Sequence, residues 1–296
     1  MCVHLCREPL PPGSAFQLTD KVVCASPELV ALQMTPMLTD LELDVLLAEL
    51  LGLYAVCPQT EDGMFQRREP LMTPQSMRAY LDALGPRHGT ARIRRALTRT
   101  CVCSGSPLET KLTLRLSLRP SLGGYGLNVL AMNAPVMVRR INDSLAVGVR
   151  KPDILIGEPQ DGPVPDFSRV VAVEYNGWRH GNPTRAAQDA ARSNELKARG
   201  IPEYVVWKEQ YDDLDYMDGL VARIRRDLGV PRVGLTSRAV AKRRRLRQRL
   251  YEELELIDGI HWNGRERERR RGQGASELAY APESDWDVVP VEAYGF

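Results

Sequence analysis

Apolar residues recur at helical spacing through much of the first hundred residues. Positions 43, 46, 47, 50 and 51 are apolar, which is the period of an amphipathic helix. Ser26, Pro27 and Glu28 form a helix start signal, because Ser caps exposed N–H groups, Pro suits the first helical position and an acid suits the helix N-terminus. We expect a mostly helical N-terminal region, with helices at 27–35, 41–53, 74–84 and 89–99 and short extended segments at 2–6, 15–18 and 21–25.

The pattern after residue 103 is ambiguous at first. Leu112, Leu114, Leu116 and Leu118 alternate with other residues, as in a strand. Ser106, followed by Pro and then an acid, is a helix start signal, so we predict a helix that ends before Pro120. The Gly-rich run at 123–126 then predicts a loop.

Short apolar runs separated by loops dominate the next hundred residues. A run that ends at Gly200 has the length of a helix, and the residues after it form a short buried strand. Strands that alternate with helices predict an α/β domain. The expected strands lie at 135–141, 144–149, 152–156, 169–176 and 201–207, and the expected helices at 184–199 and 211–228.

Composition narrows the class of protein. The 296 residues have a net charge of only +2, so the whole-chain charge gives no indication of nucleic-acid binding. No run of 18 apolar residues is present, and the first 13 residues lack the apolar centre of a secretory signal, so we expect a cytoplasmic protein. Cys2, His4 and Cys6 would share one face of a strand; ordinary cysteines are favoured there over a zinc site, which would need a fourth ligand.

Charge is unevenly distributed near the C-terminus. Residues 232–272 contain 13 Lys or Arg and 6 Asp or Glu, whereas residues 273–296 contain five acids and no Lys or Arg. The basic run is suited to binding DNA phosphates. It also suits a solvated helix face, because Glu252, Glu253 and Glu255 follow at helical spacing. The candidate nucleic-acid contacts in this run are Arg243, Arg244, Arg245 and Arg247.

Two acids flank the most apolar strands of the α/β region. Asp153 precedes Ile-Leu-Ile, and Glu174 follows Val-Val-Ala-Val. If these strands pair as a hairpin, both side chains project from one face. Carboxylate oxygens suit Mg²⁺ or Mn²⁺, and such an ion lowers the pKa of an attacking water in phosphodiester hydrolysis. Alternatively, each acid simply occupies a wet strand end.

Residues 104–228 resemble the PD-(D/E)XK restriction-endonuclease-like superfamily, in the branch similar to very-short-patch-repair (Vsr-type) endonucleases. Three segments carry the resemblance: Ser-Pro-Leu-Glu-Thr at 106–110, Lys-Pro-Asp-Ile-Leu-Ile at 151–156 and Val-Ala-Val-Glu-Tyr-Asn-Gly at 171–177. His180, Asp189 and Arg192 continue it. The first hundred residues look like bacterial AbiEi-type proteins, which are linked to toxin–antitoxin and phage-defence loci. The implied architecture is a restriction-endonuclease-like mixed sheet flanked by helices, with domains at 1–103 and 104–230 and a basic helix and acidic tail at 231–296.

The resemblance also implies roles. Asp153 and Glu174 would be the strand acids that bind metal, and Glu109 would complete the metal site. Ser106 and Glu109 also fit a capping box, which explains their spacing without a metal. His180 would be a catalytic candidate, and Arg192 a phosphate contact, although Asp189 and Arg192 also have the spacing of a surface ion pair.

The sequence departs from the family at one position. The family has Lys two residues after the second strand acid, where this chain has Asn176. Asn hydrogen-bonds a water but carries no positive charge. His180 or Lys208 would be the substitute, and Lys208 is also a candidate nucleic-acid contact.

Three hypotheses follow. The first is a Mg²⁺-dependent DNA endonuclease or nickase in bacterial defence or repair. The second is a non-catalytic DNA-binding regulator or antitoxin on a degenerate nuclease fold, which Asn176 favours. The third is a protein–protein module, with a homodimer or a partner protein contacting the N-terminal region.

Overall fold

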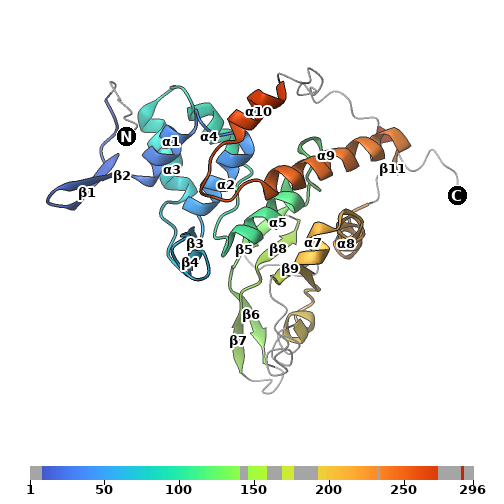
Figure 1. Cartoon of the computed structure of the whole chain (residues 1–296). Helices are drawn as coiled ribbons and strands as arrows, with labels where there is room; N and C mark the ends of the chain where they lie inside the picture. Colours follow the sequence, from blue (N-terminus) through green and yellow to red (C-terminus); the bar gives the residue numbers. More distant parts are fainter. Residues whose placement is uncertain are drawn as a thin grey trace, which may run out of the picture.

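A computed structural model describes residues 9–140, 146–158, 169–176, 193–231, 234–272 and 288–289. The chain is a mixed α/β protein with one mixed four-stranded sheet and several smaller two-stranded sheets. Figure 1 shows the N-terminal helices gathered at one end of the molecule and the four-stranded sheet beside them. The Cys2, His4 and Cys6 prediction falls outside the described residues.

Four short helices form the N-terminal region, as expected. Three of them begin at a Ser or Thr whose side chain accepts a hydrogen bond from a backbone N–H of the first turn: Ser26, Thr39 and Thr73. The fourth is shorter than the expected 89–99. The helices are α1 (Pro27–Met34), α2 (Asp40–Leu50), α3 (Pro74–Leu84) and α4 (Thr90–Ala96).

Two small antiparallel hairpins accompany these helices. One, β1 (Ala15–Thr19) with β2 (Val22–Ala25), agrees with the extended segments expected there. The other, β3 (Tyr54–Val56) with β4 (Met64–Gln66), was not predicted, because three-residue strands are too short for a recognisable alternation.

The ambiguous segment after Ser106 is helix α5 (Pro107–Ser117), which confirms the helical alternative. Ser106 Oγ accepts from Glu109 N at 3.1 Å, which caps the helix. Residues 110–116 are all buried, so polar and apolar positions do not sort onto two faces. The alternating leucines therefore reflect a helix surrounded by protein rather than a strand.

The four-stranded sheet has the order β10–β9–β8–β5. Strand β9 pairs antiparallel with β8 and parallel with β10, while β5 adds antiparallel to the far side of β8. Strand β5 was not predicted, although the other three lie where the apolar runs indicated. The bounds are β5 (Val129–Met132), β8 (Ile154–Gly157), β9 (Val170–Asn176) and β10 (Glu203–Trp207).

One face of this sheet is covered by a third hairpin and a helix. Strands β6 (Val136–Arg139) and β7 (Val147–Arg150) pair antiparallel, as two of the expected strands. Residues 193–198 are helical, and the helix ends before Gly200, which has φ +85°. These elements share a cluster of buried apolar side chains with the sheet: Val136, Val138, Leu155, Val170, Ala172, Leu196 and Ile201.

The opposite face packs against helices. The single helix expected at 211–228 is two helices, α7 (Lys208–Asp212) and α8 (Leu214–Asp227), because Asp213 leaves the helical conformation to cap α8 with its side chain. Helix α5 packs on this face with α8 and α9 (Ser237–Glu255). The shared cluster includes Leu112, Leu116, Ile154, Val171, Val173, Val206, Ile224 and Leu254.

Helix α9 lies close to the short 3-10 helix η1 (Pro120–Leu122) and the Gly-rich loop after it. Gly123 has φ +87°, and a Cβ there would lie 2.3 Å from the carbonyl oxygen of Leu246. Glycine is therefore required for this approach.

The C-terminal segment returns to the N-terminal helices. Helix α10 (Gly264–Gly272) begins where Gly264 N donates to the buried Glu42 Oε1 at 2.7 Å. Helix α2 contributes to both the N-terminal cluster and the cluster around α5. The boundaries at residues 103 and 230 remain predictions. Strands β11 (Gly234–Leu235) and β12 (Val288–Val289) pair antiparallel, and no described helix is long and apolar enough to span a bilayer.

Candidate functional site

The two strand acids lie next to each other. In the β8–β9 ladder Ile154 pairs with Val173, so continuing the register by one residue places Asp153 opposite Glu174. Side chains alternate along a strand, so both acids project from the face that carries Leu155. The predicted metal site requires this common face.

Backbone groups hold Asp153 in place. Its Oδ2 accepts a hydrogen bond from Tyr175 N at 2.8 Å, which satisfies an N–H just beyond the last ladder pair. Asp153 and Glu174 lie close enough for each to affect the pKa of the other.

Burial raises the pKa of both acids well above the usual range of a carboxyl group. For Asp153 the next cause is the negative charge of Glu109, and for Glu174 it is the charge of Asp153. The strongest charges acting on the pair are thus other carboxylates. Such a pair favours a shared proton or a cation over two free negative charges.

A further acid, Glu203, lies on the same face and was missed by the sequence analysis. Strand β10 runs parallel to β9 with Glu203 opposite Ala172, and Ala172 shares its face with Glu174. The charge of Glu203 raises the pKa of Glu174 and of Asp153. Its position at the start of a strand was visible, but the parallel register that brings it near Glu174 was not.

Glu109 stands at the edge of the site. Its Oε2 accepts from Gly105 N at 2.8 Å and from Asn133 Nδ2 at 2.9 Å. Asn133 N also donates to the carbonyl oxygen of Asp153 at 3.2 Å, which connects Glu109 to the strand acid through one residue. Within the described residues, however, no three His, Cys, Asp or Glu side chains are grouped closely enough to hold a metal ion.

Two further catalytic candidates were predicted, Asn176 and His180, and the structure describes only Asn176. Asn176 lies two residues after Glu174 on β9, so it shares the acid face, and it pairs in register with Trp207. His180 and Arg192 lie outside the described residues, and so does Asp189.

Lys208 faces away from the acids. Its Nζ lies 2.6 Å from Asp212 Oδ1 and 3.7 Å from Glu255 Oε2. Burial raises the pKa of Tyr175, and the positive charge of Lys208 partly offsets that rise, so Lys208 lies near Tyr175. Tyr175 follows Glu174 on β9 and therefore points to the opposite face of the sheet. The suggestion that Lys208 replaces the motif lysine is therefore not supported by its position.

The basic run of α9 makes contacts within the protein. Arg247 Nη1 lies 2.7 Å from Asp218 Oδ1 on α8, and its guanidinium stacks 4.7 Å from the Tyr125 ring centroid. Arg244 pairs with Asp215, also on α8. Arg245 is exposed and Arg243 is half-buried. Two of the four candidate arginines thus attach α9 to α8.

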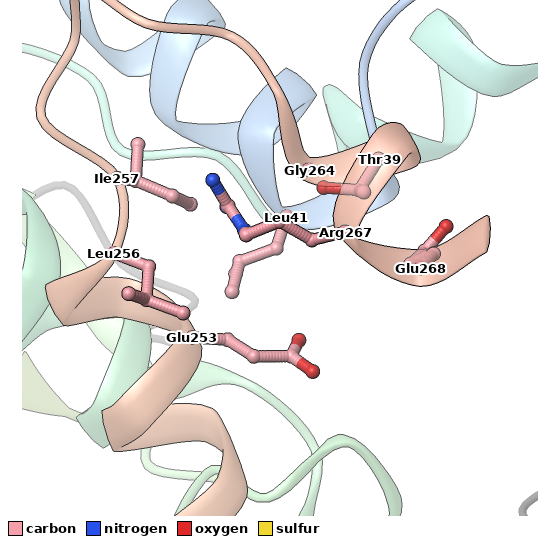
Figure 2. A pocket seen from close by; sticks show the side chains of 8 residues that line it. All are labelled: Thr39, Leu41, Glu253, Leu256, Ile257, Gly264, Arg267 and Glu268. Carbon is pink, nitrogen blue, oxygen red and sulfur yellow. The ribbon is translucent and has the colours of Figure 1, made fainter. Parts of the chain in front are cut away.

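Two recesses in the described part of the chain are lined by residues other than the strand acids. A cavity of about 20 Å³ lies where α2, α9 and α10 meet. That volume holds about one water molecule. Figure 2 shows Arg267 extending from α10 towards Ile257, between Glu268 and the end of α9 that carries Glu253. A wider groove of about 410 Å³ lies beside α1.

Comparisons with family models, with curated proteins and with solved structures returned no match for this chain.

Proposed function

We propose that the chain is a metal-dependent DNA endonuclease or nickase built on a restriction-endonuclease-like sheet. The observation that carries the proposal is the adjacent pair Asp153 and Glu174, which shares one sheet face at the end of two apolar strands. The order of elements from α5 through β8 and β9 to the helix before Gly200 supports the same architecture.

The chemistry of the donor set fits Mg²⁺ or Mn²⁺. Magnesium sites commonly use one or two carboxylates, with water and substrate phosphate as the other ligands. Asp153 and Glu174 supply two carboxylates whose pKa values are raised first by burial and then by the negative charge of another carboxylate, Glu109 for Asp153 and Asp153 for Glu174. A cation would offset that negative charge and remove the repulsion. Glu109, which is hydrogen-bonded to Asn133, would not bind the cation as a third ligand. Its negative charge would strengthen the attraction of the acid pair for the cation.

Each residue would then have a defined task. The metal, when bound, would polarise the phosphoryl oxygen and lower the pKa of the attacking water. Tyr175 N fixes Asp153 Oδ2, so that the carboxylate is held ready before any ligand arrives. The Asn176 side chain shares the acid face and has an amide group that can orient a water by hydrogen bonding.

A second candidate function is DNA binding without hydrolysis. Asn176 at the lysine position favours it, because a neutral amide stabilises negative charge on a phosphate or on an attacking hydroxide less than a lysine ammonium does. This protein would bind DNA with a steep dependence on salt and with no response to a chelator.

Plasmid cleavage separates these functions. Supercoiled plasmid is incubated with Mg²⁺, Mn²⁺ or EDTA and with wild type, Glu174→Gln or the control Glu61→Gln, which changes an exposed acid. We expect nicks from wild type and the control in either metal, and none in EDTA or from Glu174→Gln. Equal cutting by wild type and Glu174→Gln would exclude the proposed site. DNA binding without cutting by wild type would favour the second function.

A further inference from the structure

The β6–β7 hairpin has one covered face and one open face. Val136 and Val138 point inward to the cluster beneath the sheet. The register pairs Met137 with Val149 and Arg139 with Val147, so these four side chains share the outward face. Met137 is 56% exposed, Val149 44% and Val147 63%. Apolar side chains this exposed on neighbouring positions indicate a contact surface.

The two strands of this hairpin and the residues that flank them carry charge of one sign, whereas the segment that joins the strands contains one acid, Asp143. Residues 133–140 and 146–151 contain Arg139, Arg140, Arg150 and Lys151 and no carboxylate. Arg150 is used internally, because its Nη2 lies 2.5 Å from the buried Glu195 Oε2. Arg139 and Lys151 are exposed. A surface that combines apolar side chains with positive charge fits nucleic acid better than a neutral protein surface.

The base of the hairpin adjoins the acid pair. Strand β7 continues through Lys151 and Pro152 directly into Asp153. At the start of β6, Asn133 N donates to the carbonyl oxygens of Pro152 and Asp153 at 3.0 and 3.2 Å. Figure 1 shows the hairpin extending from the four-stranded sheet on the side away from α1–α4. A duplex with a phosphate at Asp153 would therefore pass beside the hairpin.

The other exposed hairpin lacks these properties. Val22 and Val23 are 45% and 66% exposed on β2, but neither β1 nor β2 contains an Arg or a Lys. The β1–β2 hairpin also lies well apart from β6–β7, beside α1 and α3 (Figure 1). It provides a matched comparison of similar shape and similar apolar exposure.

We propose that the outward face of β6–β7 binds duplex DNA by entering the major groove beside the bond to be cut. This inference rests on the proposed function and deepens it. The major groove is about 12 Å wide and admits a two-stranded ribbon. Arg139 would contact a backbone phosphate, and Met137 and Val149 would contact base edges and thymine methyl groups.

The test measures DNA binding and cutting separately. Binding of a labelled random-sequence duplex is followed by fluorescence anisotropy in EDTA, over a series of salt concentrations. The variants are Arg139→Gln, the double variant Met137→Ser with Val149→Ser, and the control Val22→Ser with Val23→Ser. Circular dichroism and thermal unfolding check that each variant is folded.

The expected results differ between variants. Arg139→Gln should weaken binding and lower the slope of log affinity against log salt by about 1, because one phosphate contact is lost. The double variant should weaken binding roughly tenfold with the slope unchanged, because it removes only apolar contacts. The control should bind like wild type.

Two failures are distinguishable. If wild type binds and cuts DNA and both hairpin variants do so equally well, the hairpin inference is wrong and the nuclease proposal stands. If wild type neither binds nor cuts, both are wrong. Should binding fall equally in the β1–β2 control, the loss would reflect general surface hydrophobicity, and the inference would also be rejected.

Discussion

Replacing Glu174 by Gln should make the metal-free protein more stable at alkaline pH. Directly opposite side chains on antiparallel strands have Cβ atoms about 4.5–5.5 Å apart. Two negative charges about 5 Å apart repel by about 3 kcal/mol at an effective dielectric constant of about 20. Gln has nearly the same shape as Glu and removes this repulsion, so the gain in the free energy of unfolding should approach that value when both acids would be ionised.

The sign of the pH dependence follows from the raised pKa values of Asp153 and Glu174. An acid with a raised pKa binds its proton more tightly in the folded state. Its contribution to stability is complete below the unfolded pKa of about 4 and is lost as pH rises through the folded pKa. Wild type should therefore lose stability with rising pH, and Glu174→Gln should lose less.

Urea unfolding in EDTA between about pH 5 and pH 9 measures this difference. The two curves should meet or cross near the acidic end, where wild-type Glu174 is protonated, and separate towards the alkaline end. Mn²⁺ should stabilise wild type more than the variant, because a ligand that binds only the folded state raises its stability. Parallel curves would refute the reasoning, and the control Glu61→Gln should run parallel to wild type.

Three further changes test the packing that positions the site, each by urea unfolding. Ser106→Ala should cost about 1 kcal/mol through loss of the α5 cap; an unchanged stability would show that the cap is replaced. Glu42→Ala should cost roughly 3 kcal/mol, because the N–H of Gly264 loses a buried charged acceptor. Protection of α10 from proteolysis should fall with it, and intact protection would contradict this role. Arg247→Ala should lower the free energy of unfolding by about 1 kcal/mol, because the ion pair with Asp218 is lost, and should leave DNA affinity unchanged. A large loss of DNA affinity at unchanged stability would contradict this structural role.

Local signals predicted much of the fold. Helix caps such as Ser26 and Ser106 act over three residues, so they are visible in the sequence and recur in the structure. Apolar runs identified the buried strands β8 and β9. The signals that failed were weak or overridden: β5 is a partly exposed strand at the edge of the sheet, and the break at Asp213 comes from a cap inside an otherwise helical run.

The site was predictable only where neighbouring strands determined it. A hairpin of β8 and β9 brings Asp153 and Glu174 to one face once both strands are recognised. Glu203 lies near Glu174 because β10 pairs parallel with β9. The register of that pairing depends on the length and path of the segment between the two strands, which local sequence signals do not give. The same limit applies to Lys208, whose direction follows from its place at the start of α7, on the face opposite the acids.

The acid pair destabilises the fold, so the need to fold does not explain why both residues are acids. Like charges directly opposite each other destabilise a sheet, and burial makes each charge more costly. An oppositely charged pair, or a Thr with the same hydrogen bond to Tyr175 N, would satisfy that N–H without repulsion. Arrangements that destabilise the folded protein are found chiefly at functional sites, where a bound ligand can offset the cost. With Asn176 in place of lysine, binding and hydrolysis would be separable under the proposed function. The acid pair would hold the cation, whereas the rate of cleavage would depend on which other group stabilises the attacked phosphate.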